Sequence, residues 1–498
     1  MGVDKKTIQQ WDRQYVWHPF TQHTVWNARE PLVIVAGEGE FLIDADGKRY
    51  IDGVSSMWCN VHGHRHPSID AAIKAQLDRV AHTTLLGLTH PLAAELARRL
   101  VEIAPAGTAD KETGRHGDAE TRRHGDAGTQ RRGDKETGRH GDKERRVLSK
   151  VFYSDDGSTA VEVAIKMAYA YWHHRGQPRR SRFLALRNAY HGDTIGAVSV
   201  GCVEVFHGVY KPLLFETLVA PSPYCYRCEL GRSPATCGIA CAAEMERMLQ
   251  TNADRVAGVI VEPLMQCAGG MIAAPAGYLK KVREACDRQG VLLIADEVAT
   301  GFGRTGRMFA CEHECVVPDL LCIGKGLTGG YLPVAATLAT QRIYDAFLGA
   351  PEELKTFFHG HTFTGNPLGC AAAVASLDVF AKEQVLASLP PKIELLGERL
   401  RKMAANRWVG DVRQCGLLAG VELVADKASK REFPYGLQVG AEVCMAARKH
   451  GAILRPLGNT IVLFPPLCIS QETLARLLDI IETCIEEIVP GLAACSRG

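Results

Sequence analysis

Residues 258–296 read GVIVEPLMQCAGGMIAAPAGYLKKVREACDRQGVLLIAD. Two short apolar runs, Gly258–Pro263 and Val291–Asp296, flank a segment with helical spacing over Tyr278–Gln289, which Gly290 ends. Uninterrupted apolar runs of this length are typical of strands that are buried on both faces of a parallel sheet. The order strand, helix, strand predicts an α/β fold with a mainly parallel central sheet.

The alternation of strand and helix patterns extends over most of the chain. Lys150–Tyr153 reads as a strand, and Ser158–Trp172 reads as a helix with one apolar face. After residue 345 we expect helices near 366–385 and 390–405, strand-like runs near 413–424 and 460–464, and a helix at 471–488. These patterns predict an N-terminal segment, 1–65, that packs with a small α+β domain, 345–498, beside a large α/β domain, 66–344.

Composition narrows the class of protein. The chain has 498 residues, of which 46% are hydrophobic and 23% are charged, as in soluble globular proteins. Its net charge of +2 lacks the basic excess of proteins that bind nucleic acid or anionic membranes. Met1–Lys6 is charged, unlike a secretory signal, and no apolar run reaches the ~18 residues of a membrane span. With 17 cysteines, an odd number, we expect reduced thiols and a cytoplasmic protein.

Residues 111–142 consist of four eight-residue units, KETGRHGD, AETRRHGD, AGTQRRGD and KETGRHGD. None contains Leu, Ile, Val or an aromatic residue, so the segment cannot bury enough surface to offset its ordering entropy. We therefore predict a disordered insert over 111–146. It precedes the strand at Lys150–Tyr153, and we expect it to loop away from any pocket and to leave activity intact.

Three short motifs carry candidate chemistry. Gly157 and Ser158 begin a predicted helix and offer free backbone N–H groups and a hydroxyl to an anion such as phosphate; an ordinary helix cap is the alternative. Asp296 ends an apolar strand, where ligands of α/β sheets bind, although it can equally be a capping residue. Lys325 lies between two glycines without the spacing of a nucleotide-binding loop. It is either a desolvated catalytic lysine or an exposed one.

Two further turns complete the set. Tyr190-His-Gly-Asp193 places an aromatic ring next to a histidine and an acid, and Phe358–Pro367 is rich in Gly and Thr. A phosphate anchor, an aromatic platform, an aspartate, a lysine and a second threonine, in this order, together describe a pocket for pyridoxal phosphate.

The sequence resembles the class III aminotransferases of fold type I, from about residue 11 to 488 except at the insert. The motifs that carry the resemblance are Trp17–Thr21, Ser55–Trp58, Phe152–Ser158, Tyr190–Thr194, Asp296–Gly306, Gly324–Gly326, His359–Thr362 and Arg455-Pro456. Within the class, the WHPF, YHGDT and HGHT stretches are similar to those of members that act in biotin biosynthesis. Such enzymes convert 8-amino-7-oxononanoate to 7,8-diaminononanoate.

The resemblance implies roles for the matched residues on the cofactor side. Lys325 binds pyridoxal phosphate covalently and then carries the proton between substrate and cofactor. Asp296 pairs with the ring nitrogen and Tyr190 stacks on the ring, and both count as catalytic residues with Lys325. The remaining cofactor-binding residues are Gly157, Ser158, His361 and Thr362. Thr362 reaches the phosphate from the neighbouring subunit of a homodimer, so that the active sites are shared.

On the substrate side the resemblance implies that Arg455 pairs with the substrate carboxylate. The other implied substrate-binding residues are Met57, Trp58, Tyr190, Lys325 and Gly360. Asp193 and Arg304 are implied as supporting groups near the entrance.

The amino donor stays open. Phe20, Met57 and Val462 stand where many members of the family have Tyr, Trp and Tyr, and all three belong to the substrate side. S-adenosylmethionine is the usual donor, and one branch that shares Phe20 uses lysine. The alternatives are another class III ω-aminotransferase that uses pyruvate or 2-oxoglutarate, an aminomutase or racemase, and a regulatory protein that binds the cofactor.

Two patterns suit metals. Cys225, Cys228, Cys237 and Cys241 have spacing compatible with a zinc site, and reduced thiols in a surface loop are the alternative. The histidines at 62, 64 and 66 alternate in a loop that ends in proline. The implied chemistry needs no metal, and we expect none.

Overall fold

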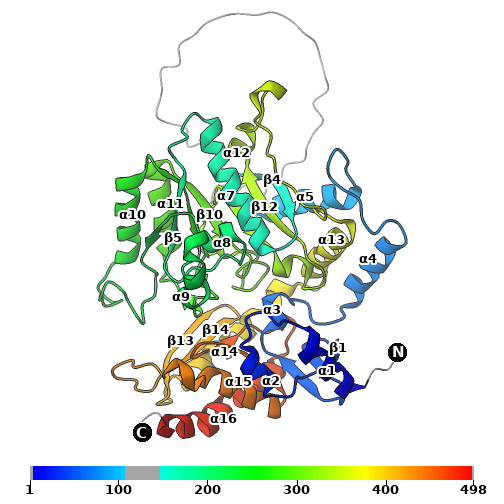
Figure 1. The fold of residues 1–498 in the computed structure, drawn as a ribbon, viewed down its shortest axis with the longest axis vertical. Helices are drawn as coiled ribbons and strands as arrows, with labels where there is room; N and C mark the ends of the chain where they lie inside the picture. The colour runs from blue at the N-terminus through cyan, green and yellow to red at the C-terminus, as the bar shows by residue number, and fades with distance from the viewer. Residues whose placement is uncertain (1–3, 107–145, 496–498) are drawn as a thin grey trace, which may run out of the picture.

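A seven-stranded sheet forms the centre of the computed structural model, which describes residues 4–106 and 146–495. The strand order is β4-β12-β11-β10-β7-β5-β6 (Figure 1). The strands are β4 (Leu148–Ser154), β5 (Arg182–Leu186), β6 (Thr217–Ala220), β7 (Val256–Val261), β10 (Leu292–Asp296), β11 (Leu320–Ile323) and β12 (Ala335–Thr340). Only β12 runs antiparallel to its neighbours. The predicted α/β fold with a mainly parallel sheet is confirmed.

Helices cover both faces of this sheet because its strands are apolar on both sides. Leu292 and Ile294 share a buried cluster with residues of α7 (Gly157–His174), whereas Leu293 and Ala295 share another with residues of α11 (Tyr278–Gln289). Helix α11 has the predicted bounds, and Gly290 ends it with a left-handed φ of 59°, a conformation that favours glycine. The other helices around the sheet are α4 (Pro67–Leu77), α5 (Pro91–Ile103), α8 (Ile195–Ser199), α9 (Glu204–His207), α10 (Ala240–Asn252), α12 (Gln341–Asp345) and α13 (Pro367–Lys382).

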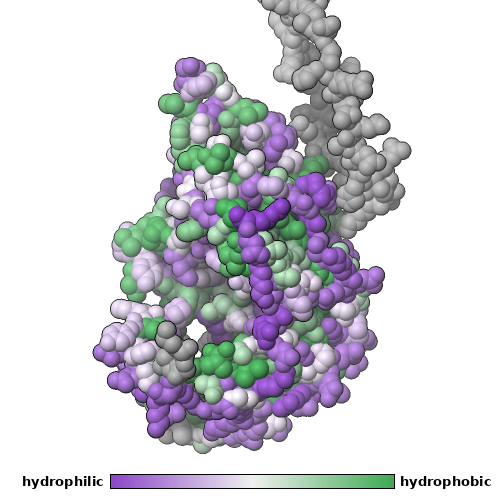
Figure 2. All heavy atoms as spheres, turned by 90° about the vertical axis from the view of Figure 1, so that its right-hand side faces the viewer, coloured by the Kyte–Doolittle hydropathy of each residue, from purple (hydrophilic) through white to green (hydrophobic). Residues whose placement is uncertain are grey.

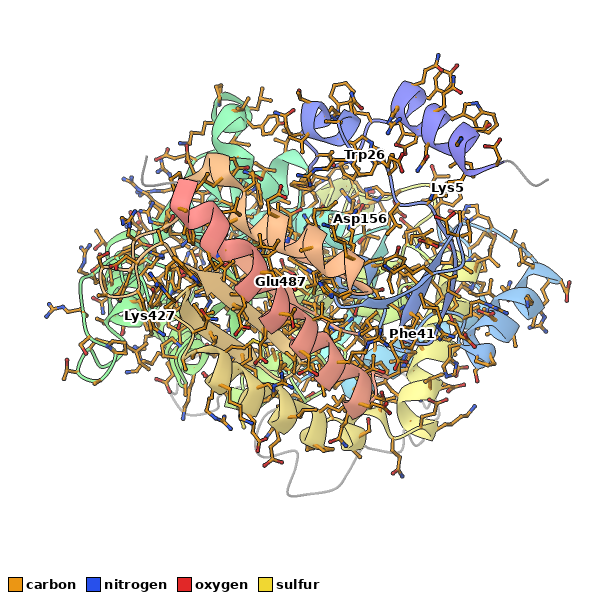
Figure 3. The ribbon with its side chains drawn as sticks, turned by 90° about the horizontal axis from the view of Figure 1, so that it is seen from below. Lys5, Trp26, Phe41, Asp156, Lys427 and Glu487 are labelled. Atoms are coloured by element: carbon orange, nitrogen blue, oxygen red, sulfur yellow. The ribbon has the colours of Figure 1, made fainter. Side chains whose placement is uncertain are left out.

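A second, antiparallel sheet lies below the first in Figure 1, with strand order β13-β14-β17-β16. Its strands are β13 (Val409–Cys415), β14 (Leu418–Leu423), β16 (Arg455–Leu457) and β17 (Thr460–Leu463). The apolar run at 413–424 is thus two strands, because Gly416 at a φ of 61° turns the chain. The helices α14 (Pro390–Met403), α15 (Val439–Lys449) and α16 (Gln471–Cys495) pack here. Figure 3 shows α16, with Glu487, running across the underside.

The N-terminal strands join this lower part. They are β1 (Ile34–Glu38), β2 (Phe41–Asp44) and β3 (Arg49–Asp52), and β3 pairs in parallel with β15 (Ala452–Ile453). The helices α1 (Lys5–Tyr15), α2 (His23–Asn27) and α3 (Ser55–Trp58) and a small ribbon of β8 (Met265–Gln266) and β9 (Ile272–Ala273) complete these elements. The domain boundaries at 65 and 344 stay a prediction. Of the insert predicted to be disordered, residues 111–145 lie outside the described residues. The prediction is wrong for Arg146, which forms ion pairs with Asp287 and Asp319.

Short 3-10 helices occupy several connections. They are η1 (Gly208–Leu213), η2 (Ala310–Glu314), η3 (Lys325–Thr328), η4 (Pro351–Glu353), η5 (Val385–Ser388) and η6 (Tyr435–Leu437).

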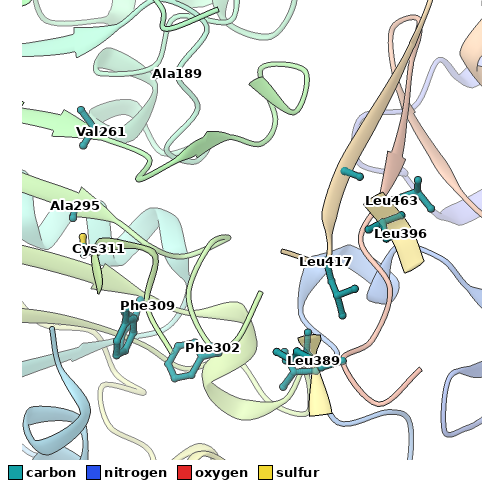
Figure 4. Close-up of a cluster of buried hydrophobic side chains, with 14 of the residues drawn as sticks. Ala189, Val261, Ala295, Phe302, Phe309, Cys311, Leu389, Leu396, Leu417 and Leu463 are labelled. Atoms are coloured by element: carbon teal, nitrogen blue, oxygen red, sulfur yellow. The ribbon is translucent and has the colours of Figure 1, made fainter. Parts of the chain in front are cut away.

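One buried cluster connects the two sheets. In Figure 4 it runs from Val261 and Ala295 at the large sheet, through Phe302 and Phe309, toward Leu417 of the hairpin. All five side chains are almost completely buried. Because they pack in one contiguous core, the position of the small sheet relative to the large one is set by apolar contacts.

At the edge of the large sheet where β11 begins, Asp319 is completely buried. It accepts hydrogen bonds from Arg283 at 2.7 Å, Arg342 at 2.8 Å and Arg146 at 3.1 Å, and from the Leu293 N–H at 2.8 Å. Burial by itself raises the pKa of Asp319, but the charges of the three arginines hold it below its ordinary value of 3.8. The pocket lies at the opposite ends of these strands, so this network serves stability.

We therefore predict that Asp319→Asn lowers the free energy of unfolding at pH 7 by about 3–5 kcal/mol, because it leaves the buried Arg283 guanidinium without its buried anion. The lowered pKa means that the wild-type stabilisation is present above pH 3.8 and is lost as the pH falls through the folded-state value. Urea unfolding at pH 7 measures the loss. The control Asp287→Asn removes a half-exposed partner of Arg283 and should cost less than about 1 kcal/mol; equal losses would contradict the assignment.

Candidate functional site

A cavity of about 400 Å³ lies beyond the carboxyl ends of β10 and β11. Seven of the site residues predicted from the sequence line it, namely Met57, Trp58, Gly157, Ser158, Tyr190, Asp296 and Lys325. They come from the N-terminal part, the start of α7 and the ends of the central strands. Ligands of α/β sheets bind at this edge, so the predicted residues meet where the topology allows a site.

Lys325 follows β11 and is the first residue of η3. Its φ of 42° is left-handed, which costs a residue with a side chain roughly 1–3 kcal/mol and is typical of functional sites. Its Nζ lies 5.4 Å from the centroid of the Trp58 ring. A Cβ on Gly326 would come within 2.9 Å of the Phe302 Cβ, so glycine is needed directly after the lysine.

Asp296 is the last residue of β10 and is almost fully buried. One carboxylate oxygen lies 2.7 Å from Nδ1 of His191, and the other accepts the Val298 N–H at 3.0 Å. These two contacts fix the plane of the carboxylate at the wall of the cavity. The opposite ring nitrogen of His191, Nε2, is buried without a hydrogen-bond partner among the described residues.

The N-terminus of α7 forms another wall. Asp156 caps the helix by accepting the Thr159 N–H at 2.9 Å. A Cβ on Gly157 would lie 2.4 Å from Cγ1 of Val298, and one on Gly192 would lie 2.2 Å from Oγ of Ser158. The backbone therefore packs too closely for larger residues here, and the positive end of an 18-residue helix faces a pocket that suits a phosphate.

Tyr190 contributes its ring and its backbone. Its hydroxyl donates to Asp193 at 2.7 Å, and its N–H donates to Glu262 at 3.1 Å. Burial and then the hydrogen bond with Asp193 raise the pKa of Tyr190 far above its ordinary value. The tyrosine is therefore a neutral aromatic surface at physiological pH.

Glu262 is a pocket residue that sequence reasoning missed. It follows β7, lines the cavity and accepts the N–H groups of Tyr190 and Cys267. Burial raises its pKa to about 7. The usable signal was its position directly after a buried strand, comparable with that of Asp296, which ends such a strand. His191 was also missed as a functional residue, although its place next to Tyr190 was noted.

Arg455 approaches the cavity from β16. Its guanidinium contacts Sδ of Met57 and lies 5.9 Å from the centroid of the Trp58 ring and 5.7 Å from that of Phe20. Burial lowers its pKa, and no carboxylate of the described chain pairs with it. Val462 is its cross-strand partner on β17. A cation held among apolar groups is suited to an anionic ligand.

The loop at 358–362 is not brought into the cavity of this chain. Gly360 and Thr362 are exposed. His361 touches the site only indirectly, since its Nδ1 lies 2.9 Å from the pocket residue Asp155. The role of Thr362 in a neighbouring subunit stays a prediction.

Arg304 is completely buried behind the pocket wall. It donates to the carbonyl oxygens of Pro465 at 2.6 Å, Asn60 at 3.0 Å and Trp58 at 3.5 Å. Burial lowers its pKa to about 10. Arg304 therefore stabilises the backbone behind the cavity wall and does not face the cavity.

The two patterns considered for metals have other partners in the structure. The histidines contact separate groups: His62 contacts Ser376, His64 contacts Asp52 and His66 contacts Glu383. The four cysteines Cys225, Cys228, Cys237 and Cys241 line a small cavity. Over the described ranges, no group of three His, Cys, Asp or Glu residues is arranged to hold a metal ion.

Within residues 4–106 and 146–495, no helix combines the length and the apolar character that a membrane crossing requires.

Comparison with known proteins gives a consistent result. Residues 23–113 and 139–485 match the family described as aminotransferase class III. The adenosylmethionine-8-amino-7-oxononanoate aminotransferase of Geobacter sulfurreducens is 53% identical over 98% of this chain and 99% of its own length. That of Aquifex aeolicus is 47% identical over 98% of both chains.

Solved structures agree. The crystal structure of the enzyme of that name from Methanocaldococcus jannaschii has a TM-score of 0.85 and 43% identity, and covers 97% of this chain and 100% of its own. An amine transaminase from an uncultivated Pseudomonas species, solved with PLP bound, has a TM-score of 0.82 and 34% identity, over 95% and 99% of the two chains. The chain belongs to the class III aminotransferase family.

Proposed function

We propose that this protein is a pyridoxal-phosphate-dependent aminotransferase that converts 8-amino-7-oxononanoate to 7,8-diaminononanoate in biotin biosynthesis. The observation that carries the proposal is the placement of two cations along one indole ring. The Trp58 ring lies 5.4 Å from the Lys325 amine and 5.9 Å from the Arg455 guanidinium. A substrate with a reacting ketone, an apolar chain and a terminal carboxylate matches this order of amine, aromatic ring and guanidinium.

The pocket fits the cofactor that the family uses. The close approach of Gly157 to Val298 leaves the N-terminus of α7 open to a phosphate. Asp296, fixed by His191, is placed to hold a ring nitrogen in its protonated form. When bound, pyridoxal phosphate supplies an electron-withdrawing ring that stabilises negative charge on the carbon that loses its proton. Lys325 binds the cofactor covalently and moves that proton, and Tyr190 packs against the ring.

We propose S-adenosylmethionine as the amino donor, in line with the names of the relatives. Phe20, Met57 and Val462, the positions that differ from many members of the family, do not select between this donor and lysine. Met57 lines the cavity, Phe20 lies beside Arg455, and Val462 is completely buried. The donor experiment below therefore decides between the two.

We further propose a homodimer in which Thr362 of one subunit reaches the phosphate of the other. Leu86, Leu354 and Phe358 are large hydrophobic residues that are at least 68% exposed, and a partner subunit that covered them would remove apolar surface from water. Figure 2 shows several groups of exposed hydrophobic residues on one face. We also expect a cytoplasmic location, because the cysteines whose side chains the structure describes are all free.

The first prediction concerns Lys325. The purified enzyme should show a visible absorbance band from bound cofactor. S-adenosylmethionine and lysine are added in separate experiments, and the true amino donor should bleach the band. Lys325→Ala should lose the native band and at least about 10²–10⁴-fold in activity, the usual contribution of general acid–base catalysis. Lys281, which is exposed, supplies the control: Lys281→Ala should behave as wild type.

A native band and bleaching in Lys325→Ala would refute the assignment. Turnover with pyruvate alone would point to a general ω-aminotransferase.

The second prediction concerns Arg455. Arg455→Ala should lower kcat/KM for 8-amino-7-oxononanoate by about 10- to 100-fold, since hydrogen bonds to a charged group are worth about 1.5–3 kcal/mol. The control substrate is the analogue of 8-amino-7-oxononanoate that lacks the carboxyl group. Wild type and Arg455→Ala should have similar kcat/KM for this analogue. Steady-state kinetics with both substrates measures the effect. Equal losses on both would mean that Arg455 does not bind the carboxylate.

The third prediction concerns pH. Glu262, whose pKa is raised to about 7, gains a proton as the pH falls through that value and can no longer accept two N–H groups equally. At pH values below 7 we expect kcat/KM to be about 3- to 10-fold lower, which is the effect of losing one hydrogen bond. In Glu262→Gln, kcat/KM should be low at every pH and should not change with pH. Glu297 is the control, because burial also raises its pKa to about 7 but it accepts from Ala310 and Cys311. Glu297→Gln should keep the wild-type pH profile.

A further inference from the structure

We propose that Asp52 is a positioning residue of the substrate site. Its buried carboxylate holds the turn Val54–Trp58 in a strained conformation that presents Met57 and Trp58 to the cavity. The inference rests on the proposed function only for the identity of the substrate that these side chains contact. Asp52 itself does not line the cavity.

The turn is strained along most of its length. Ser55, Ser56 and Trp58 have φ values of 49°, 59° and 65°, and Met57 lies between them at −131°. None of the four is glycine, and each left-handed residue costs about 1–2 kcal/mol. Strain of this kind persists only where the surroundings over-determine the conformation. The residues of the turn, two serines and two with large side chains, do not by themselves favour left-handed backbone conformations.

Asp52 supplies the compensating contacts. It ends β3 and is completely buried. Its two carboxylate oxygens accept the Ser56 N–H at 2.9 and 2.8 Å, and one of them accepts the Ser56 hydroxyl at 3.2 Å. The Val54 N–H donates at 3.4 Å, and Nε2 of His64 lies 3.0 Å away. Bonds between N–H groups and a carboxylate are among the stronger ones in proteins.

Other restraints act beside Asp52. The Trp58 N–H donates to the Val54 carbonyl at 2.9 Å, and the Cys59 N–H donates to the Ser55 carbonyl at 3.1 Å. The Ser55 hydroxyl donates to the Phe464 carbonyl at 2.6 Å, and the Trp58 ring stacks on Phe464 at 5.2 Å and 11°. Arg304 donates to the carbonyl of Trp58 at 3.5 Å. None of these contacts reaches the Ser56 N–H, for which Asp52 is the acceptor. The conformation of the middle of the turn therefore depends on Asp52.

Loosening the turn affects one side of the site. Met57 contacts the Arg455 guanidinium, and the Trp58 ring lies beside the Lys325 amine. Gly157 and Asp296, which face the proposed cofactor position, stand on other elements. Loss of the Asp52 carboxylate should therefore weaken the binding of a long substrate and leave cofactor binding unchanged.

The experiment uses three variants of the full-length holoenzyme. Asp52→Asn should raise KM for 8-amino-7-oxononanoate at least about tenfold, with kcat within about threefold and the cofactor absorbance band unchanged. Ser56→Gly keeps the N–H and removes the steric penalty of the positive φ, so it should have near wild-type KM. The double variant should regain most of the loss of Asp52→Asn. A loss without this rescue would overturn the proposal, because Asp52 would then act through its charge alone.

Hydrogen exchange gives a readout that does not need the reaction. The peptide that covers residues 53–60 should exchange faster in Asp52→Asn, with other peptides unchanged. If wild type does not turn over the keto acid, the proposed function fails, while exchange still tests the turn. Unchanged exchange overturns the role of Asp52. If Asp52→Asn does not fold, Asp52→Glu keeps the charge but displaces the carboxylate from the Ser56 N–H, and it should raise KM and speed exchange of residues 53–60; a wild-type KM and wild-type exchange in that variant also overturn the proposal.

Discussion

Parallel pairing of β7, β10 and β11 is the constraint on which the site depends. Leu293 of β10 pairs with Val259 of β7, and Ile294 of β10 pairs with Leu320 of β11. Because the three strands run in the same direction, the residues that follow them emerge at one edge. Glu262, Asp296 and Lys325 thus meet although the chain separates them widely. The N-terminus of α7 and Trp58, which stacks on Phe464, then add two further walls to a group of side chains that the sheet has already assembled.

The opposite edge of the same strands has a different chemistry. There, Asp319 binds three arginines and the backbone of β10. One end of the sheet is consolidated by a network of charged hydrogen bonds, while at the other end an aspartate, a glutamate and a lysine line the cavity. The division lets the strands be held rigidly without using the groups that react.

Much of this arrangement was predictable from the sequence, since it depends on local patterns. The apolar runs predicted β7 and β10, and Gly290 predicted the end of α11. Asp296 was recognised as the end of a strand, and Lys325 was recognised from its flanking glycines and the family motif. Features that depend on distant contacts were not predictable. Glu262 directly follows a buried strand, but its contacts with the backbone N–H groups of Tyr190 and Cys267 could not be read from the residue pattern. The turn at Gly416 was hidden in an apolar run, and α16 continues through Pro490 because tertiary packing outweighs the local cost of the proline.

The packing of the Trp58 turn has a consequence for synthesis of the chain. The Ser55 hydroxyl binds the Phe464 carbonyl, 409 positions later, and β3 needs β15 as its neighbour. Until these C-terminal residues have been synthesised, the Ser55 hydroxyl and β3 lack these partners. The turn that carries Met57 and Trp58 can therefore gain its full set of contacts only after the strand that ends in Asp296 and the segment with Lys325 have been made.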